Sequence, residues 1–110
     1  MKSILQERRE CWACRVFYNK VNTRRLEEHH IFQGIRRQAS EEYGLKIWLC
    51  PAHHRDPGLG VHFDPWFTAS LKATARRQFA RRWPELNFFE IFGKEYESDE
   101  PGSSGGQADR

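Results

Sequence analysis

Long apolar runs are absent from this sequence, and its cysteines are too few for a disulfide framework. A helix needs about eighteen consecutive apolar residues to cross a bilayer. No stretch of this sequence is that long and apolar, so no transmembrane segment is expected. The opening residues, MKSILQERRE, lack the apolar core of a signal peptide. Three cysteines cannot all pair with one another. These absences predict a cytoplasmic chain with reduced thiols and no membrane partner.

Apolar residues are also scarce: they make up 38% of the 110 residues, and the mean hydropathy is −0.84. A chain of this length fits one domain with a small core. Because so little apolar burial offsets the entropy lost on ordering the chain, a bound metal would help to stabilise the fold.

Charge is unevenly distributed along the chain. The formal net charge is +3, and residues 94–110 hold two basic and five acidic side chains, so residues 1–93 carry +6 (16 basic minus 10 acidic). This excess suits a polyanionic partner such as nucleic acid, although a merely charged surface would have the same composition. Residues 97–110, ESDEPGSSGGQADR, are typical of a disordered tail, so the domain is predicted to span residues 1–96.

Four nitrogen and sulfur donors occur in two close pairs, Cys11-x-x-Cys14 and Cys50-x-x-His53. Two such pairs can close a tetrahedron around Zn²⁺. The pattern favours a structural zinc site of the treble-clef kind, with the first pair in a knuckle, a hairpin in the intervening chain and the second pair opening a helix. The alternative is a redox dithiol beside an unrelated cysteine.

The intervening chain contains strand and turn patterns. Residues 16–32, VFYNKVNTRRLEEHHIF, predict two short strands around a turn at residues 22–23. Residues 34–44 predict a short helix or structured loop, and residues 45–50, LKIWLC, predict a strand. Pro51 fits the first turn of a short helix that would carry the second donor pair's histidine.

Asp64 followed by Pro65 predicts the start of a basic amphipathic helix over residues 65–83. No acidic residue lies between Asp64 and Glu85, and Pro84 ends the helix, after which ELNFFEIFG can fold back on the domain. The apolar stripe of this helix recurs at four-residue spacing: Phe67, Leu71, Ala75 and Phe79. Each tryptophan borders an apolar segment and is predicted to be a core residue: Trp12, Trp48, Trp66 and Trp83. The predicted fold class is α+β.

Three histidines near the zinc pattern are not needed for it: His29, His30 and His54. Neighbours on a strand point to opposite faces, so at most one of His29 and His30 faces His54 unless the strand is bent. His62, in GVHFD, could return over the helix start and join them, or could orient the turn before Asp64. The histidines could instead pack in the interior.

With these histidines beside a zinc pattern, LEEHHIF and LKIWLCPAHH resemble the two halves of the HNH motif of His-Me finger nucleases, which are built on a ββα-metal unit. The resemblance covers residues 11–54, and GVHFD and FFEIFGKEY are similar to small HNH-like proteins of phages and prophages. It implies that His30 is the general base, and that His29 and His54, with His62 as a third candidate, hold a catalytic divalent cation.

The same resemblance implies a structural zinc at Cys11, Cys14, Cys50 and His53, and a metal-dependent endonuclease that hydrolyses DNA. The chain departs from the motif in having no asparagine between His30 and Cys50, where Gly44 or Leu45 stands, and in having Gln33 where a proline is usual. A second site made only of histidines suits Zn²⁺, Ni²⁺ or Mn²⁺ better than Mg²⁺. Cutting both strands of a duplex would require a homodimer, although no segment identifies an interface.

Two groups of arginines are candidates for phosphate contact. The first group flanks the histidines: Arg24, Arg25, Arg36 and Arg37. The second lies on the predicted helix, where a solvated face is an equal explanation: Arg76, Arg77, Arg81 and Arg82. The rival function is a non-catalytic treble-clef module that binds nucleic acid or protein. In a further alternative, His29 or His30 replaces His53 as the fourth zinc ligand, and the remaining histidines no longer supply both a general base and a catalytic cation site.

Overall fold

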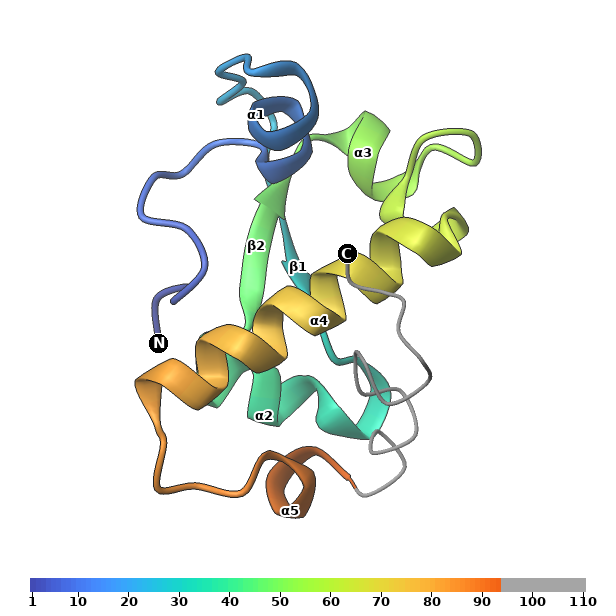
Figure 1. Cartoon of the computed structure of the whole chain (residues 1–110). Coiled ribbons are helices and arrows are strands. Elements are labelled where there is room, and N and C mark those ends of the chain that lie inside the picture. Colours follow the sequence, from blue (N-terminus) through green and yellow to red (C-terminus); the bar gives the residue numbers. More distant parts are fainter. Residues whose placement is uncertain (94–110) are drawn as a thin grey trace.

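The computed structural model describes residues 1–93, and these form a two-stranded sheet with helices packed around it (Figure 1). The predicted tail at residues 97–110 and the predicted domain boundary at residue 96 lie outside the described residues. Within them, no helix is both long enough and apolar enough to span a membrane. In chain order the elements are α1 (Trp12–Tyr18), β1 (Glu27–His30), η1 (Gly34–Arg36), α2 (Arg37–Glu42), β2 (Lys46–Leu49), α3 (Pro51–Arg55), η2 (Val61–Phe63), α4 (Pro65–Arg82) and α5 (Phe88–Phe92).

The sheet fixes which face each histidine of β1 occupies. β1 and β2 are antiparallel, with His29 opposite Ile47 and His30 opposite Lys46. Because partners in register share a face and successive residues alternate, His29 lies on the face of Ile47, which belongs to the core, and His30 lies on the other face. The prediction that neighbouring histidines point apart is confirmed.

Only one edge of β1 is paired with a strand in the described part of the chain. On the far side of β2, the N-terminal segment supplies hydrogen bonds instead: Trp48 N–H donates to Gln6 Oε1 at 2.8 Å, and Ser3 Oγ donates to the carbonyl of Lys46 at 2.6 Å. The edge of β2 is therefore covered by residues 3–6, while no strand pairs with the outer edge of β1.

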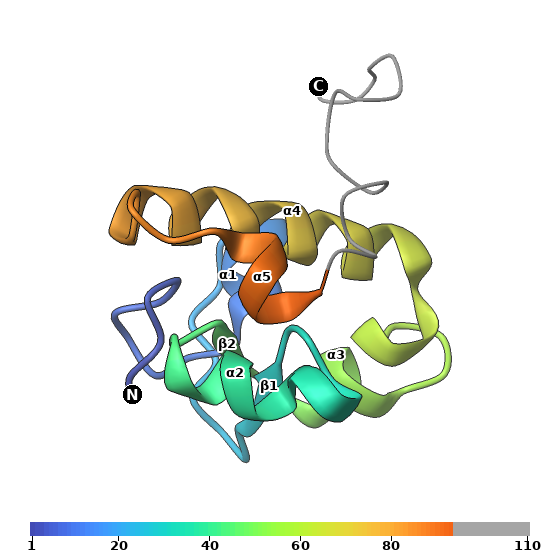
Figure 2. The same ribbon diagram turned by 90° about the horizontal axis from the view of Figure 1, so that it is seen from below.

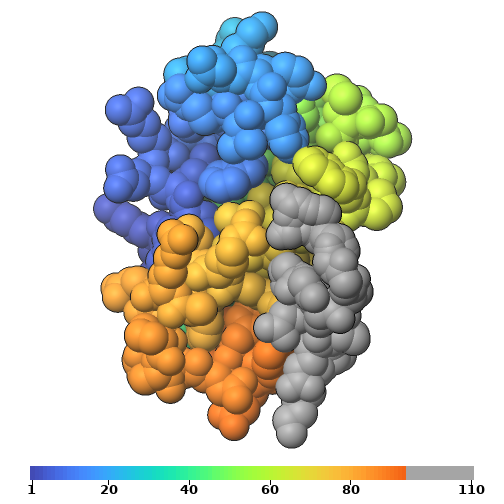
Figure 3. Space-filling model, viewed as in Figure 1, coloured from blue at the N-terminus to red at the C-terminus, as the bar shows by residue number. Residues whose placement is uncertain are grey.

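Helix α4 confirms the sequence prediction closely. Asp64 is its N-cap and accepts a hydrogen bond from Phe67 N–H at 3.0 Å, and Pro65 follows in the first turn. The helix runs diagonally across one face of the sheet (Figure 1), and α5 folds back beside it (Figure 2). All four residues of the predicted apolar stripe are buried: Phe67, Leu71, Ala75 and Phe79. On the face of the molecule that carries α4, atoms of the N-terminal segment, α1 and α4 lie side by side at the surface (Figure 3).

The prediction of two strands in residues 16–32 is wrong in its first half, because Trp12–Tyr18 form helix α1. Cys11 caps this helix by accepting from Cys14 N–H, and Asn19 ends it in the left-handed conformation with φ 53°. Asparagine tolerates that conformation better than most residues, so the helix stops there. Local capping thus overrode the β-propensity of Val16, Phe17 and Tyr18.

The prediction that all four tryptophans are core residues is wrong for Trp66, which is 67% exposed. Trp66 stands in the first turn of α4, beside the buried Phe67 but on a different face of the helix. Trp12 and Trp83 pack against the core, and Trp48 is half-buried beneath the guanidinium of Arg9, 4.3 Å from the ring centroid.

Candidate metal centres

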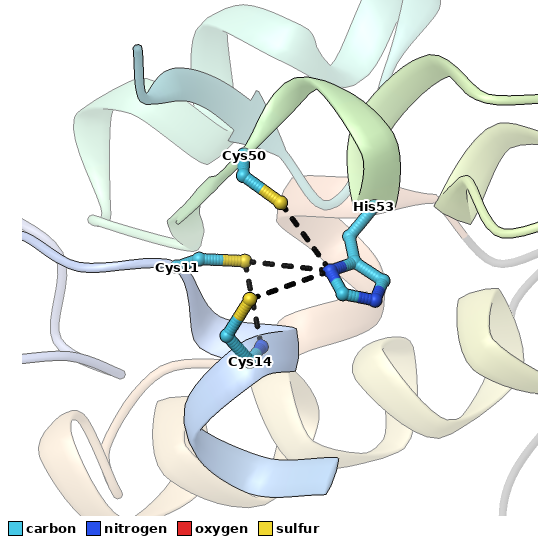
Figure 4. A group of neighbouring side chains, drawn as sticks. All are labelled: Cys11, Cys14, Cys50 and His53. Atoms are coloured by element: carbon cyan, nitrogen blue, oxygen red, sulfur yellow. Dashed lines mark hydrogen bonds between the residues drawn. The ribbon is translucent and has the colours of Figure 1, made fainter. Parts of the chain in front are cut away.

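Three cysteines and a histidine converge where α1, the end of β2 and α3 meet (Figure 4). Cys11 and Cys14 come from the start of α1, Cys50 follows β2, and His53 lies on α3. Their ligand atoms all lie within 4.8 Å of one another. The four positions predicted for a structural zinc therefore form one cluster, which is compatible with a structural metal such as zinc.

The distances within this Cys₃His cluster fit a tetrahedral ion. His53 Nδ1 lies 3.3 Å from Cys50 Sγ, 3.6 Å from Cys14 Sγ and 3.8 Å from Cys11 Sγ. With a Zn–S bond of about 2.3 Å and a Zn–N bond of about 2.0–2.1 Å, tetrahedral angles place sulfur and nitrogen about 3.6 Å apart. The cluster uses His53 as its nitrogen donor, and His29 belongs to a different group of side chains.

Burial disfavours a free thiolate at Cys11. Burial raises the pKa of the Cys11 thiol to about 12. A bound divalent cation would supply the positive charge that lets buried thiols deprotonate. Tyr18 contacts the cluster from outside, because its ring stacks on the ring of His53 with a centroid separation of 5.8 Å.

A second cluster contains His29, His54 and His62, whose ligand atoms lie within 4.8 Å of one another. His54 Nε2 and His62 Nε2 are 3.1 Å apart, and the His29 ring lies 5.3 Å from that of His54 and 5.1 Å from that of His62. Two imidazole nitrogens bonded at about 2.1 Å to one ion, at octahedral or tetrahedral angles, are about 3.0–3.4 Å apart. The three-histidine cluster thus has the dimensions of a metal site, and it brings together all three residues predicted for one.

Glu27 orients His54 within this cluster. Its carboxylate lies 2.7 Å from His54 Nδ1 and accepts a hydrogen bond from Arg55 Nε at 2.8 Å. The hydrogen bonds from Arg55 and then from His54 lower the pKa of Glu27 to about 2, so the carboxylate is ionised. An ionised acceptor at Nδ1 leaves the Nε2 lone pair of His54 facing the cluster, as in carboxylate–histidine–metal arrangements.

Burial and the neighbouring histidines favour the neutral forms of His29 and His62. Burial first, and then the charges of His54 and His62, lower the pKa of His29 to about 3. Burial also lowers the pKa of His62. Neutral imidazoles are the form that binds a cation.

His30 lies on the opposite face of β1 and contacts different groups. Its Nε2 is 2.8 Å from Glu41 Oε1, and Lys46 Nζ donates to both Glu41 oxygens at 3.0 and 2.8 Å. The ring is 5% exposed, and it lines a surface pocket of about 610 Å³ together with Glu28, Arg37 and Gln38. Glu28, His30 and Glu41 could themselves hold a cation, but Lys46 Nζ is already paired with both carboxylates, at 2.8–3.0 Å.

We expect Glu41→Gln to lower the free energy of unfolding by up to about 1 kcal/mol at pH 7, since solvent screens this 45% exposed side chain. The hydrogen bonds from Lys46 and then from His30 lower the pKa of Glu41 from 4.5 to about 2 in the folded chain. A carboxyl whose pKa falls on folding stabilises above its unfolded pKa, and this contribution is lost as pH falls toward the folded value.

The difference between wild type and Glu41→Gln should therefore be constant from pH 8 to 6 and smaller at pH 4. Urea unfolding in excess zinc at these three pH values measures it. A difference that grows on acidification would contradict the assigned contacts.

Six of the eight predicted phosphate-contacting arginines are exposed: Arg24, Arg25, Arg37, Arg77, Arg81 and Arg82. Arg36 and Arg76 are half-buried. The Arg76 guanidinium lies 5.1 Å from the ring centroid of Phe89, and that of Arg82 lies 5.2 Å from the ring of Trp83. These two guanidinium groups therefore lie over aromatic rings in cation–π contacts.

Sequence reasoning missed both carboxylates that contact the histidines. Glu27 stands two residues before His29 and so shares its strand face, a signal that alternation contains. Glu41 carries no such signal, since α2 approaches β1 only in the folded chain. Searches against models of known protein families, curated proteins and solved structures found no match to this chain. Any function must therefore be argued from these clusters themselves.

Proposed function

We propose that this chain is a metal-dependent endonuclease of the HNH, or His-Me finger, kind that hydrolyses DNA phosphodiester bonds. One observation carries the proposal: successive residues of β1 serve two different sites, with His29 in a three-histidine cluster and His30 at a pocket on the other face. A separate Cys₃His cluster is available for a structural zinc in a treble-clef arrangement.

His30 acts as the general base. The ionised Glu41 accepts a hydrogen bond from Nε2–H of His30, which leaves the lone pair on Nδ1. Nδ1 takes a proton from water, the water oxygen attacks phosphorus, and the bond from phosphorus to the 3′ oxygen breaks. The leaving oxygen is protonated from solvent. Glu41 is here a positioning residue, which fixes the tautomer and orientation of the ring.

His29, His54 and His62 would hold the catalytic divalent cation. Such a cation stabilises charge on the phosphate and on the leaving oxygen. Glu27 orients His54 toward it, through the contact of 2.7 Å. Since all three ligands are imidazoles, Mn²⁺, Ni²⁺ or Zn²⁺ should support the reaction better than Mg²⁺.

The substrate lies along the outer edge of β1, which no strand of residues 1–93 covers. A phosphodiester there has the three-histidine cluster on one side and His30 on the other. Arg37 lines the His30 pocket and is placed to contact an adjacent phosphate, and Lys46 offsets the acidic side chains beside it.

The test is nicking of supercoiled plasmid by protein that holds one equivalent of zinc, with Mn²⁺, Ni²⁺, Zn²⁺ or Mg²⁺ added in separate reactions. We expect nicking only after a second cation is added. His54→Ala should lower the metal content from two equivalents to one and abolish nicking, while leaving the circular dichroism spectrum unchanged.

The absence of cleavage with every cation, from protein that binds only one zinc, would sink the nuclease proposal. Cleavage that persists in His54→Ala would locate the cation elsewhere. In the first case a non-catalytic zinc module that binds nucleic acid or protein becomes the function to test.

A further inference from the structure

An exposed aromatic surface lies where α1 meets the start of α4, and we call it the aromatic patch: Phe17, Tyr18 and Trp66. Their exposed fractions are 43%, 56% and 67%. The Phe17 ring lies 6.4 Å from that of Trp66 and 5.2 Å from the buried ring of Phe67. The patch is therefore anchored on the core while three large rings remain open to solvent. Large rings gathered on a surface in this way mark a binding site.

Basic residues outnumber acidic ones in the chain around the patch, where Asp64 caps α4 beside Trp66 and Glu10 is paired with Arg15 of α1. Residues 11–26, which include α1, hold four basic residues and no acidic one, and residues 65–84, which include α4, hold five basic residues and no acidic one. Figure 3 shows α1 and the beginning of α4 meeting on one face of the molecule. Aromatic rings flanked by cations fit a partner with flat apolar faces on an anionic backbone, which is the chemistry of unpaired nucleotides.

The patch contacts the Cys₃His cluster and is close along the chain to the three-histidine cluster. Tyr18 stacks on His53, and His53 directly precedes His54 of the three-histidine cluster. Trp66, in the first turn of α4, stands four residues after His62, which belongs to η2. A strand whose bases stack on these rings would therefore have its backbone beside the candidate cation site.

We infer that Phe17, Tyr18 and Trp66 bind unpaired DNA bases, so that the preferred substrate of the chain is single-stranded DNA or a duplex with an unpaired segment. This inference rests on the proposed function for its biological setting. Its binding step does not need the cleavage chemistry. In a fully paired duplex the base faces are stacked on one another, so the patch discriminates against that substrate.

The test is fluorescence anisotropy with a labelled thymidine oligonucleotide and a labelled duplex, using full-length zinc-loaded protein before any other cation is added. Trp66→Ala should weaken binding to the oligonucleotide about tenfold, and the double variant Phe17→Ala, Trp66→Ala should weaken it further. Trp66→Phe should retain most of the affinity because it keeps a ring.

Leu86→Ala is the matched control, since Leu86 is an exposed apolar residue (37%) beyond the other end of α4. It should bind as the wild type does. Circular dichroism and zinc content establish that each variant is folded.

Three results would overturn the inference. The first is unchanged oligonucleotide affinity in the folded Trp66→Ala and double variants, and the second is an equal loss of affinity for duplex. The third is a change in sedimentation with no change in DNA binding, which would make the patch an interface between copies. A uridine oligonucleotide bound as tightly as thymidine would overturn the restriction to DNA. If oligonucleotide binding is lost as expected while wild type never nicks plasmid, this inference stands and the nuclease proposal fails.

Discussion

Replacing His30 by alanine should lower the rate of plasmid nicking by about 10²- to 10⁴-fold, the usual contribution of a general base. The variant loses the imidazole that takes the proton from water. It should remain folded, because the His30 ring makes one hydrogen bond, with Glu41, and is not a member of either the Cys₃His or the three-histidine cluster. Initial nicking rates under saturating Mn²⁺ measure the effect.

Gln38→Ala is the control for His30→Ala, because Gln38 lines the same pocket but has no group that titrates. It should nick at nearly the wild-type rate, and both variants should bind two metal equivalents. Nicking by His30→Ala at the wild-type rate would remove His30 from the role of base. An equal loss in both variants would point to damage to the pocket instead of loss of a proton acceptor.

Replacing Cys50 by alanine should unfold the chain, and the effect should be the largest of any single substitution on stability. Structural zinc binding is worth about 10–16 kcal/mol in small zinc domains, and a whole domain is stable by about 5–15 kcal/mol. Cys50 is 6% exposed and joins β2 to α3, so its sulfur links the sheet to the helix that carries His53 and His54. Thermal melting and zinc content measure the loss.

His29→Ala is the control that separates the two clusters. It should lose the second cation and keep the zinc and the thermal transition, whereas Cys50→Ala should lose both. A folded Cys50→Ala protein with a normal melting temperature would show that the Cys₃His cluster does not hold a structural metal. Loss of zinc in His29→Ala would favour the arrangement in which His29 replaces His53 as a ligand.

The elements that follow from local pattern were predicted well. Asp64 and Pro65 set the start of α4, and four-residue spacing set its buried face. Pro51 opens α3, and strand alternation separates His29 from His30. Each of these depends on residues a few positions apart, so the information is present in a short stretch of sequence.

The errors arose where a local preference competed with another contact. Val16, Phe17 and Tyr18 favour a strand, but capping by Cys11 and Asn19 makes residues 12–18 a helix. The α1 helix then leaves Phe17 and Tyr18 at the surface, with Phe17 beside Trp66. Their exposure follows from how α1 and α4 meet, so a composition argument that assigned tryptophans to the core could not find it.

By itself, the sequence determined the two donor pairs of the Cys₃His cluster, the presence of further histidines beside them and the helix that closes the core, because ligand type, spacing and helix capping are local properties. Only the tertiary structure decided which histidines share a cluster, that Glu27 and Glu41 contact His54 and His30, and that three aromatic rings face solvent. These are contacts between residues far apart in the chain, and they exist only after the sheet, α3 and α4 have packed together.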